Sequence, residues 1–295
     1  NGLLCRTEER EFPLHLAQLL VPPDLVAWMK TGERGKQAVS DVEQRWNAGE
    51  TLAGADGQNA IFQETEVKLL APLPQPTSIR DFSTYEQHQQ RVTRAKGNSE
   101  VPEVWYRMPV YWKGISANTI GTGETIQWPT YSQKLDFELE YGVYIGKRGR
   151  NIPVEQAHEY IAGYTIFNDI SARDQQSEEM KMTFGPAKGK DFDTAKIFGP
   201  CMVTPDEFGT GAHLMMARIN GEEWSRGSTN GMYWSFSQLI AYISQSETLQ
   251  PGDFLGSGAC PTGCGLEINR WVSPGDVIEL EVEGIGILRN VFGRE

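Results

Sequence analysis

Asp136-Phe137-Glu138-Leu139-Glu140 is the stretch of sequence that decides how this chain is interpreted. In an extended strand, successive side chains alternate between faces, so Glu138 and Glu140 point one way while Phe137 and Leu139 point the other. Two neighbouring carboxylates repel each other, and both cost free energy to desolvate. The pair alone fits a solvent-facing acidic edge as well as it fits a cation site.

A second acidic motif further along the chain favours the cation site. Residues 168–174 read Asn-Asp-Ile-Ser-Ala-Arg-Asp, and Asp169 is placed to supply a third carboxylate. A divalent cation with oxygen ligands relieves both the repulsion and the desolvation cost of such a cluster. We therefore expect a metal site that includes Glu138, Glu140 and Asp169.

The composition is that of a globular protein with one large domain, or one large domain plus a small appendage. The chain has 295 residues, of which 39% are hydrophobic, and this is enough for a sizeable core. No apolar run approaches the roughly 18–20 residues of a membrane span, and residues 1–10 show no signal-peptide pattern. The net charge of −12 argues against nucleic acid, whose phosphates require clustered Lys and Arg. We expect a cytoplasmic protein with neither a membrane nor a nucleic-acid partner.

The four cysteines do not form a zinc-binding pattern. Cys260 and Cys264 lie close together in the sequence, but no second pair of Cys or His residues completes a site. We expect reduced thiols at these two positions and at Cys5 and Cys201.

Residues 1–65 have a helical sequence pattern that differs from the strand-rich pattern of the rest of the chain. A helix is expected over residues 24–30, after two prolines that are tolerated in a first helical turn. A second helix is expected over residues 35–47, where apolar side chains recur at helical spacing. The sequence therefore predicts a small N-terminal helical cap over residues 1–65 and a catalytic domain over residues 66–295.

The pattern from residue 66 onward predicts many strands with few short helices. Residues 84–87 match a capping box with Thr84 as the cap, which places His88 in a short helix. Strands are expected over residues 137–146, 163–169 and 277–291, and a helix over residues 235–244. The dipeptide Asn220-Gly221 is the strongest short hairpin signal. The fold class is therefore mainly β (α+β).

From about residue 67 to the C-terminus, the ordered motifs resemble the fumarylacetoacetate hydrolase family. Besides the two acidic motifs, the matching segments are Ile-Gly-Lys at 145–147, Ala-His-Glu-Tyr-Ile-Ala-Gly-Tyr at 157–164, Lys-Asp-Phe-Asp-Thr at 190–194 and Leu-Gln-Pro-Gly-Asp at 249–253. The resemblance implies a mixed β-sheet rolled into a barrel, with short helices on its periphery. It also implies that the protein is a homodimer.

The resemblance implies a set of metal ligands. The family places a divalent ion, commonly Mg²⁺, on the positions that correspond to Glu138, Glu140 and Asp169. Fumarylacetoacetases add an Asp seven residues before a catalytic His, and Asp81 and His88 have this spacing. Mn²⁺ and Ca²⁺ are the alternatives, because an all-oxygen ligand set favours hard cations.

The implied catalytic residues are His88, Glu267 and Lys190. A His is suited to remove a proton from an attacking water near neutral pH. Glu267, in a segment that reads Leu-Glu-Ile, corresponds to the carboxylate that orients the other ring nitrogen. Lys190 corresponds to a lysine that neutralises charge developing on the substrate oxygen.

The residues implied to bind substrate are Gln176, Thr194 and Arg173, although Arg173 is expected to buttress the carboxylates more than to touch substrate. The chain departs from the fumarylacetoacetase pattern at Ser83 and Met180, where tyrosines are expected. It also reads Gly-Ala-Cys-Pro at 258–261 in place of Gly-Thr-Pro. Lost hydroxyls remove donors that discriminate between substrates, so fumarylacetoacetate itself is a doubtful substrate.

The leading hypothesis is an enzyme, a metal-dependent hydrolase of C–C bonds in ketonic substances. Its substrate would be a small oxo acid of the β-diketo or acylpyruvate type, with water activated by His88 and Glu267. Same-fold alternatives are a 2-oxo-acid decarboxylase, an oxo-dioate isomerase and a sugar-acid dehydratase, since a shared fold does not fix the reaction. A non-catalytic member that retains the fold is a third reading. The spacing of Asp81 and His88 favours hydrolysis.

Overall fold

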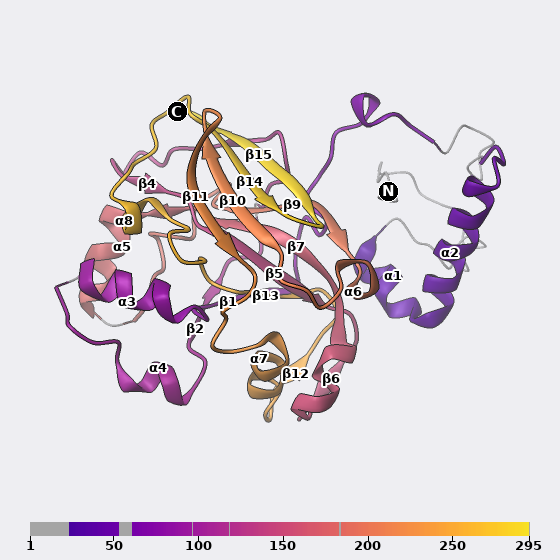
Figure 1. The fold of residues 1–295 in the computed structure, drawn as a ribbon, viewed down its shortest axis with the longest axis horizontal. Helices are drawn as coiled ribbons and strands as arrows, with labels where there is room; N and C mark the ends of the chain where they lie inside the picture. Colours follow the sequence, from indigo (N-terminus) through magenta and orange to yellow (C-terminus); the bar gives the residue numbers. More distant parts are fainter. Residues whose placement is uncertain (1–23, 53–60, 96, 118, 183, 295) are drawn as a thin grey trace. The chain divides into compact units, whose positions relative to one another are not determined.

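The computed structural model describes residues 24–52, 61–95, 97–117, 119–182 and 184–294 (Figure 1). The chain divides into two compact units, Asn1–Leu69 and Leu70–Glu295. No helix within the described ranges is long and apolar enough to cross a membrane. Cys5 lies outside the described residues, and Cys201, Cys260 and Cys264 are free thiols.

The N-terminal unit contains the two helices that the sequence predicts. Helix α1 (Leu25–Thr31) is capped by Asp24, whose side chain accepts a hydrogen bond from the backbone N–H of Ala27. Gly32, with φ of +60°, separates it from α2 (Glu33–Asn47). A short 3₁₀ helix, η2 (Glu64–Glu66), follows. A capping role for this unit stays a prediction.

The larger unit is built on two mixed sheets. The six-stranded sheet has the order β2-β1-β13-β5-β7-β9 and the five-stranded sheet the order β11-β10-β14-β15-β3. In the first sheet the strands are β1 (Ser78–Phe82), β2 (Tyr111–Gly114), β5 (Leu139–Ile145), β7 (Ile161–Asp169), β9 (Lys196–Val203) and β13 (Asp253–Gly256). In the second they are β3 (Thr125–Ile126), β10 (Leu214–Ile219), β11 (Glu222–Ser228), β14 (Val277–Val282) and β15 (Gly286–Phe292). Two small pairs join β4 (Leu135–Asp136) to β8 (Ser171–Ala172), and β6 (Gly149–Arg150) to β12 (Thr248–Leu249).

The expected closed barrel is wrong, whereas the mixed pairing is confirmed. Strands β1 and β13 pair in parallel, as do β15 and β3, and the other neighbours are antiparallel. In the described chain each large sheet keeps two edge strands, so neither closes on itself. The sheets instead pack face to face, with β14 against β7 and β10 against β5 (Figure 1). Burying one apolar face of each sheet against the other gives a common core without closure.

Short helices surround the sheets. They are α3 (Glu86–Ala95), α4 (Glu103–Arg107), η3 (Val154–Tyr160), α5 (Arg173–Glu179), η4 (Met180–Met182), α6 (Pro205–Phe208), α7 (Phe236–Ile243) and α8 (Gly265–Ile268). The predicted helix that carries His88 is confirmed as α3, but its predicted cap is wrong. The hydroxyl of Thr84 donates to the carbonyl oxygen of Ser257 at 2.6 Å, which ties the start of α3 to the segment after β13.

Two other local predictions are confirmed. The hairpin between β10 and β11 turns at Asn220 and Gly221, whose φ values are +52° and +80°, as a tight turn of this type requires. Helix α7 begins after Ser235, which forms a capping box with Gln238. Both signals are local, so they do not depend on distant parts of the chain.

The predicted continuous strand over residues 137–146 is interrupted. Strand β4 ends at Asp136 and β5 begins at Leu139, which leaves Phe137 and Glu138 between them. The carboxylate of Asp136 accepts hydrogen bonds from the backbone N–H groups of Gly265 and Leu266, at 2.7 and 3.0 Å. Through these bonds Asp136 contacts the start of α8, and residue 138 forms an isolated bridge with Cys264 instead of continuing the strand.

Candidate active site

The four predicted metal ligands lie together at one place on the six-stranded sheet. Asp81 is on β1, Glu138 precedes β5, Glu140 is on β5, and Asp169 ends β7. One carboxylate oxygen from each lies within 4.8 Å of the others, and all four side chains are buried. Strand β13 crosses the cluster at Gly256, where a Cβ would lie 2.4 Å from Asp81 Oδ1. Only glycine leaves room for the cluster at that position.

Half of the cluster is paired with cations. Glu138 accepts hydrogen bonds from Arg173 at 2.9 Å and from Lys190 at 2.6 Å. Asp169 accepts from Lys190 and, at 2.6 Å, from Lys196. Burial raises the pKa of Glu138, but the charges of Lys190 and Arg173 outweigh burial and hold that pKa well below its usual range. Lys190 therefore bridges two carboxylates, as a charge-neutralising lysine would.

The other half of the cluster lacks cationic partners. Asp81 Oδ2 accepts from the indole N–H of Trp112 at 3.1 Å, and Glu140 Oε2 accepts from the backbone N–H of Gly258 at 3.0 Å. Asp81 Oδ1 and Glu140 Oε1 are buried and receive no hydrogen bond from any described residue. Burial, followed by the charge of Asp169, raises the pKa of Asp81 to about 7. Burial and the charge of Asp81 raise the pKa of Glu140 well above its usual range.

The charges of the cluster fit one divalent ion. Asp136 adds a fifth carboxylate, bonded to Arg173 at 2.7 Å. Five carboxylates and three cationic side chains leave a formal charge of −2 in a buried site; these groups are Asp81, Asp136, Glu138, Glu140, Asp169, Arg173, Lys190 and Lys196. An ion of charge +2 would neutralise this charge and supply the missing partners of the two orphaned oxygens. The all-oxygen donor set fits Mg²⁺, Mn²⁺ or Ca²⁺.

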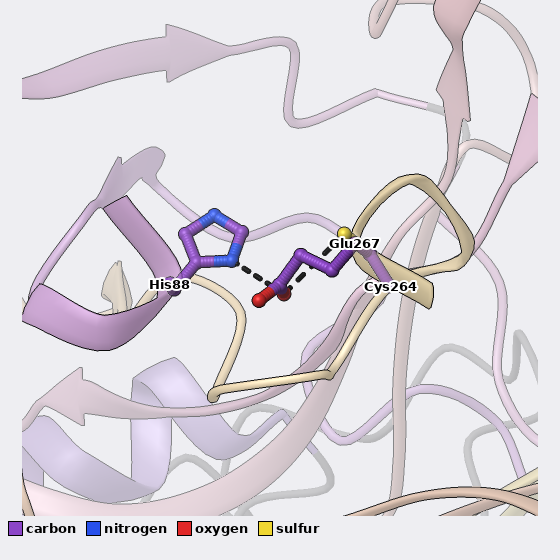
Figure 2. A group of neighbouring side chains, drawn as sticks. All are labelled: His88, Cys264 and Glu267. Atoms are coloured by element: carbon purple, nitrogen blue, oxygen red, sulfur yellow. Dashed lines mark hydrogen bonds and ion pairs between the residues drawn. The ribbon is translucent and has the colours of Figure 1, made fainter. Parts of the chain in front are cut away.

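The predicted His–Glu pair also forms. His88 Nδ1 lies 2.7 Å from Glu267 Oε1, and the other ring nitrogen points away from Glu267 (Figure 2). Helices α3 and α8, which carry the two residues, lie against each other. Glu267 Oε2 accepts from the backbone N–H of Thr262 at 3.1 Å, and the thiol of Cys264 donates to Oε1 at 3.6 Å. Arg91 Nε also lies 3.9 Å from Oε2. These contacts hold the carboxylate in place, and the carboxylate in turn fixes the orientation of the imidazole ring.

One cavity of about 1010 Å³ is lined both by the acidic cluster and by His88. All four acidic positions except Asp169 line it, together with His88 and Lys190. Several positions where the chain departs from the fumarylacetoacetase pattern also line it, namely Ser83, Met180 and Ala259. The departures therefore alter the cavity wall itself.

The three predicted substrate-binding residues have different places. Gln176 lines the cavity, and its side-chain oxygen accepts from Arg173 at 3.0 Å. Arg173 also lines the cavity but is engaged with Asp136 and Glu138, so it buttresses the cluster. Thr194 does not line this cavity, and its hydroxyl accepts from the backbone N–H of Gln127 at 2.7 Å.

Sequence reasoning missed Lys196, Trp112 and Cys264. Lys196 is the cross-strand partner of Asp169 in the β7–β9 pairing, and its ammonium group lies 4.5 Å from the centre of the Trp112 ring. These neighbours are set by strand register, for which no local motif exists. Cys264 lies three residues before Glu267, so the short turn before α8 could have indicated its contact.

Comparison with known proteins places the chain in a family. The family model described as fumarylacetoacetate (FAA) hydrolase C-terminal matches residues 77–292. The mitochondrial oxaloacetate tautomerase Fahd2a of Rattus norvegicus is 32% identical over 262 residues, which cover 88% of this chain and 77% of that protein.

Two solved structures share the fold. Fumarylacetoacetate hydrolase from the psychrophilic Exiguobacterium antarcticum has a TM-score of 0.65 and 31% identity, covering 78% of this chain and 79% of that one. Fumarylpyruvate hydrolase from Pseudomonas aeruginosa, in complex with Mn²⁺ and pyruvate, has a TM-score of 0.63 and 24% identity, covering 75% and 91%. This chain belongs to the fumarylacetoacetate hydrolase family, whose members include hydrolases and a tautomerase.

Proposed function

We propose that this protein is a divalent-metal-dependent hydrolase that cleaves a C–C bond in a β-diketo or acylpyruvate-type acid. The observation that carries the proposal is that His88, which lies 2.7 Å from Glu267, lines the same cavity as the acidic cluster. Hydrolysis needs a base that removes a proton from water next to an activated carbonyl group. A His oriented by a buried carboxylate is suited to that task.

Each group in the cavity has a part in the proposed reaction. A divalent ion held by Asp81, Glu138, Glu140 and Asp169 would polarise a substrate carbonyl and stabilise negative charge on the enolate oxygen of the leaving group. Lys190, fixed between Glu138 and Asp169, keeps a positive charge at the same wall of the cavity. This charge favours the enolate form of the leaving group.

The proton is carried by His88. In the proposed reaction, the Nδ1–H group of the ring donates a hydrogen bond to Glu267, so Nε2 holds the lone pair that takes a proton from water. The resulting hydroxide adds to the acyl carbonyl, and the bond between that carbon and the neighbouring methylene carbon breaks. The electron pair leaves with the methylene carbon as an enolate, and His88 returns its proton there. The products are a carboxylic acid and a 2-oxo acid.

Kinetics of α3 and α8 variants test this assignment. His88→Ala should lower kcat for an accepted acylpyruvate by about 10²–10⁴-fold, as loss of a general base does. Glu267→Gln should also lower kcat, since it removes the acceptor that orients the ring. Gln87→Ala, an exposed position on the same helix, is the matched control and should retain activity. Unchanged cleavage by His88→Ala would contradict the proposal.

Oxaloacetate tautomerisation is the second candidate, because the rat relative at 32% identity carries that name. It needs a base at the position of His88 but no attacking water. The test is the ultraviolet absorbance of the enol form of oxaloacetate, followed with Mg²⁺ and with EDTA. Metal-dependent loss of enol without release of pyruvate, combined with no acylpyruvate cleavage, would replace the hydrolase assignment. Release of pyruvate from oxaloacetate would point to decarboxylation instead.

Assembly and compartment stay predictions. The homodimer implied by the family is checked by light scattering after size-exclusion chromatography, and a monomeric mass would contradict it. The sequence predicts a cytoplasmic protein, whereas the name of the rat relative places that relative in mitochondria. Microscopy of the tagged full-length protein separates the two compartments.

A further inference from the structure

Trp112 contacts both halves of the acidic cluster. It lies on β2, where the strand register sets it opposite Asp81 of β1. Its indole N–H donates to Asp81 Oδ2 at 3.1 Å. The centre of its ring lies 4.5 Å from the ammonium nitrogen of Lys196 and 5.3 Å from that of Lys190. Both ammonium groups are within the roughly 6 Å over which an aromatic ring attracts a cation.

The hydrogen bond from Trp112 decides which oxygen of Asp81 is free. Strand β1 lies between β2 and β13, so Asp81 has Trp112 on one side and Gly256 on the other. Trp112 occupies Oδ2, whereas Oδ1 is buried and has no hydrogen bond from any described residue. A Cβ at Gly256 would lie 2.4 Å from Oδ1. Because residue 256 is glycine, no side chain from β13 covers this oxygen.

The ring of Trp112 is held in place by its own neighbours. Gly114 lies two residues along β2 and therefore on the same face of the strand. A Cβ at this glycine would lie 3.0 Å from Trp112 Cη2 and 3.2 Å from Lys196 Cε. Both separations are shorter than the about 3.5–4.0 Å of optimal carbon contacts. The ring and the lysine therefore pack over a position that has no side chain.

We propose that Trp112 is a positioning residue for the divalent ion. Its N–H holds Asp81 so that Oδ1 is left for the ion, and its ring keeps Lys190 and Lys196 against the carboxylates that they neutralise. A donor that orients a metal ligand in this way changes the affinity for the ion although it does not touch the ion. The inference concerns ion binding and needs no assumption about the reaction.

Mn²⁺ binding in the absence of substrate tests the proposal. Trp112→Phe removes the N–H but keeps a ring, and calorimetry should show a Kd for Mn²⁺ about 10–100-fold higher than that of the wild type. Trp128→Phe is the matched control, because it removes a comparable bond, from the indole N–H to the carbonyl oxygen of Ser132 at 2.9 Å, outside the cavity. It should bind Mn²⁺ as tightly as the wild type. Unchanged affinity in Trp112→Phe, or equal losses in the two variants, overturns the proposal.

Water-proton relaxation separates the positioning of Asp81 from a general loss of stability. A Mn²⁺ ion that loses a carboxylate ligand gains a water molecule in its place. At saturating Mn²⁺, the relaxation of water protons per bound ion should therefore be faster in Trp112→Phe than in the wild type. A variant that is merely less stable would bind fewer ions, each with the relaxation rate of the wild type, and that result would overturn the proposal.

Two further variants test the part assigned to the ring. Trp112→Leu also removes the ring, so the Tm of the metal-free protein should fall below that of Trp112→Phe. This difference should shrink in a Lys196→Met background, where one of the two cations is absent. Gly114→Ala keeps the ring and the lysine but crowds them, and it should weaken Mn²⁺ binding. An unchanged Tm difference, or normal Mn²⁺ binding by Gly114→Ala, would contradict the role of the ring.

The outcome is independent of the proposed function. Weaker Mn²⁺ binding by Trp112→Phe supports the inference even if no acylpyruvate is cleaved. Unchanged binding contradicts it even if hydrolysis is established. A wild type that binds no Mn²⁺ would overturn it as well.

Discussion

The two halves of the acidic cluster differ sharply although both are buried on one sheet. Glu138 and Asp169 have cationic partners on both carboxylate oxygens. Asp81 and Glu140 each leave one oxygen without a hydrogen bond from a described residue, and their pKa values are raised. The first half has its charges paired without an ion, whereas a divalent ion would supply the missing partners of the second half.

This difference assigns a separate role to each half. The cation-paired half fixes the position of Lys190 and supports the fold in any state. In the unpaired half, the two carboxylates repel each other, and a divalent ion bound there would remove that repulsion. Substitutions in the two halves should therefore have opposite effects on the metal-free protein.

The largest effect is expected in the cation-paired half. Lys190→Met removes the ammonium group that Glu138 and Asp169 share, so each keeps only one cationic partner and the buried cluster becomes more negative by one charge. This should lower the free energy of unfolding by about 3–5 kcal/mol. Urea denaturation of the metal-free protein measures the loss. Lys188→Met, at an exposed neighbouring position, should stay within about 0.5 kcal/mol of the wild type. Equal stability of the two variants would show that the pairing is not required.

The unpaired half should respond in the opposite direction. Glu140→Gln removes one of two repelling carboxylates, and the new amide can donate to Asp81, so the metal-free protein should be as stable as the wild type or more stable. Mn²⁺ affinity should fall by at least about tenfold, since even residues that only orient a ligand cost that much. Calorimetry and thermal melting measure both quantities. If Glu140→Gln is less stable than the wild type without metal, or binds Mn²⁺ as tightly as the wild type, the two halves do not have the separate roles assigned to them.

The effect of pH should also separate the halves. Folding raises the pKa of Asp81 to about 7, and it raises the pKa of Glu140 well above its own usual range. Over this range the folded metal-free protein therefore binds more protons than the unfolded chain. The contribution of these two groups to the free energy of unfolding falls as pH rises from about 4 through 7. Added Mg²⁺ displaces those protons, and the rise in Tm that it causes should grow over the same range. A pH-independent rise in Tm would contradict the proposed charge state.

The smallest effect is expected beside the His–Glu pair. Cys264→Ala removes a weak S–H···O contact worth less than about 1 kcal/mol, while the backbone of Thr262 still holds Glu267. The kcat for an accepted acylpyruvate should therefore fall by less than fivefold, with an unchanged Tm for the Mg²⁺ complex. A loss as large as that of Glu267→Gln would give the thiol a greater role in positioning the carboxylate.

The sequence predicts the proximity of the candidate site residues better than the closure of the sheets, because the signals for these residues are local. The spacing of Asp81 and His88, and the segment around Glu267, indicated residues that the structure brings into one cavity or its walls. Helix α3 and the turn at Asn220 were likewise readable from neighbouring residues. Such patterns depend on short stretches of chain whose conformation is set nearby.

Features that depend on long-range pairing could not be predicted in this way. Two open sheets replace the expected barrel, because strand number and register decide closure. The strand break at Phe137 results from hydrogen bonds between Asp136 and α8, more than a hundred residues away. The same reason explains why Lys196 was missed, since only the register of β9 places it at Asp169.

The most direct test of metal-dependent hydrolysis is proton NMR of butanoylpyruvate mixed with the purified protein. Spectra are compared with Mg²⁺ and with EDTA, for the wild type and for His88→Ala. The account predicts equal amounts of butanoate and pyruvate from the wild type with Mg²⁺, and cleavage at least about a hundredfold slower in the other three samples. Products that form equally with EDTA, or in the absence of His88, would contradict it.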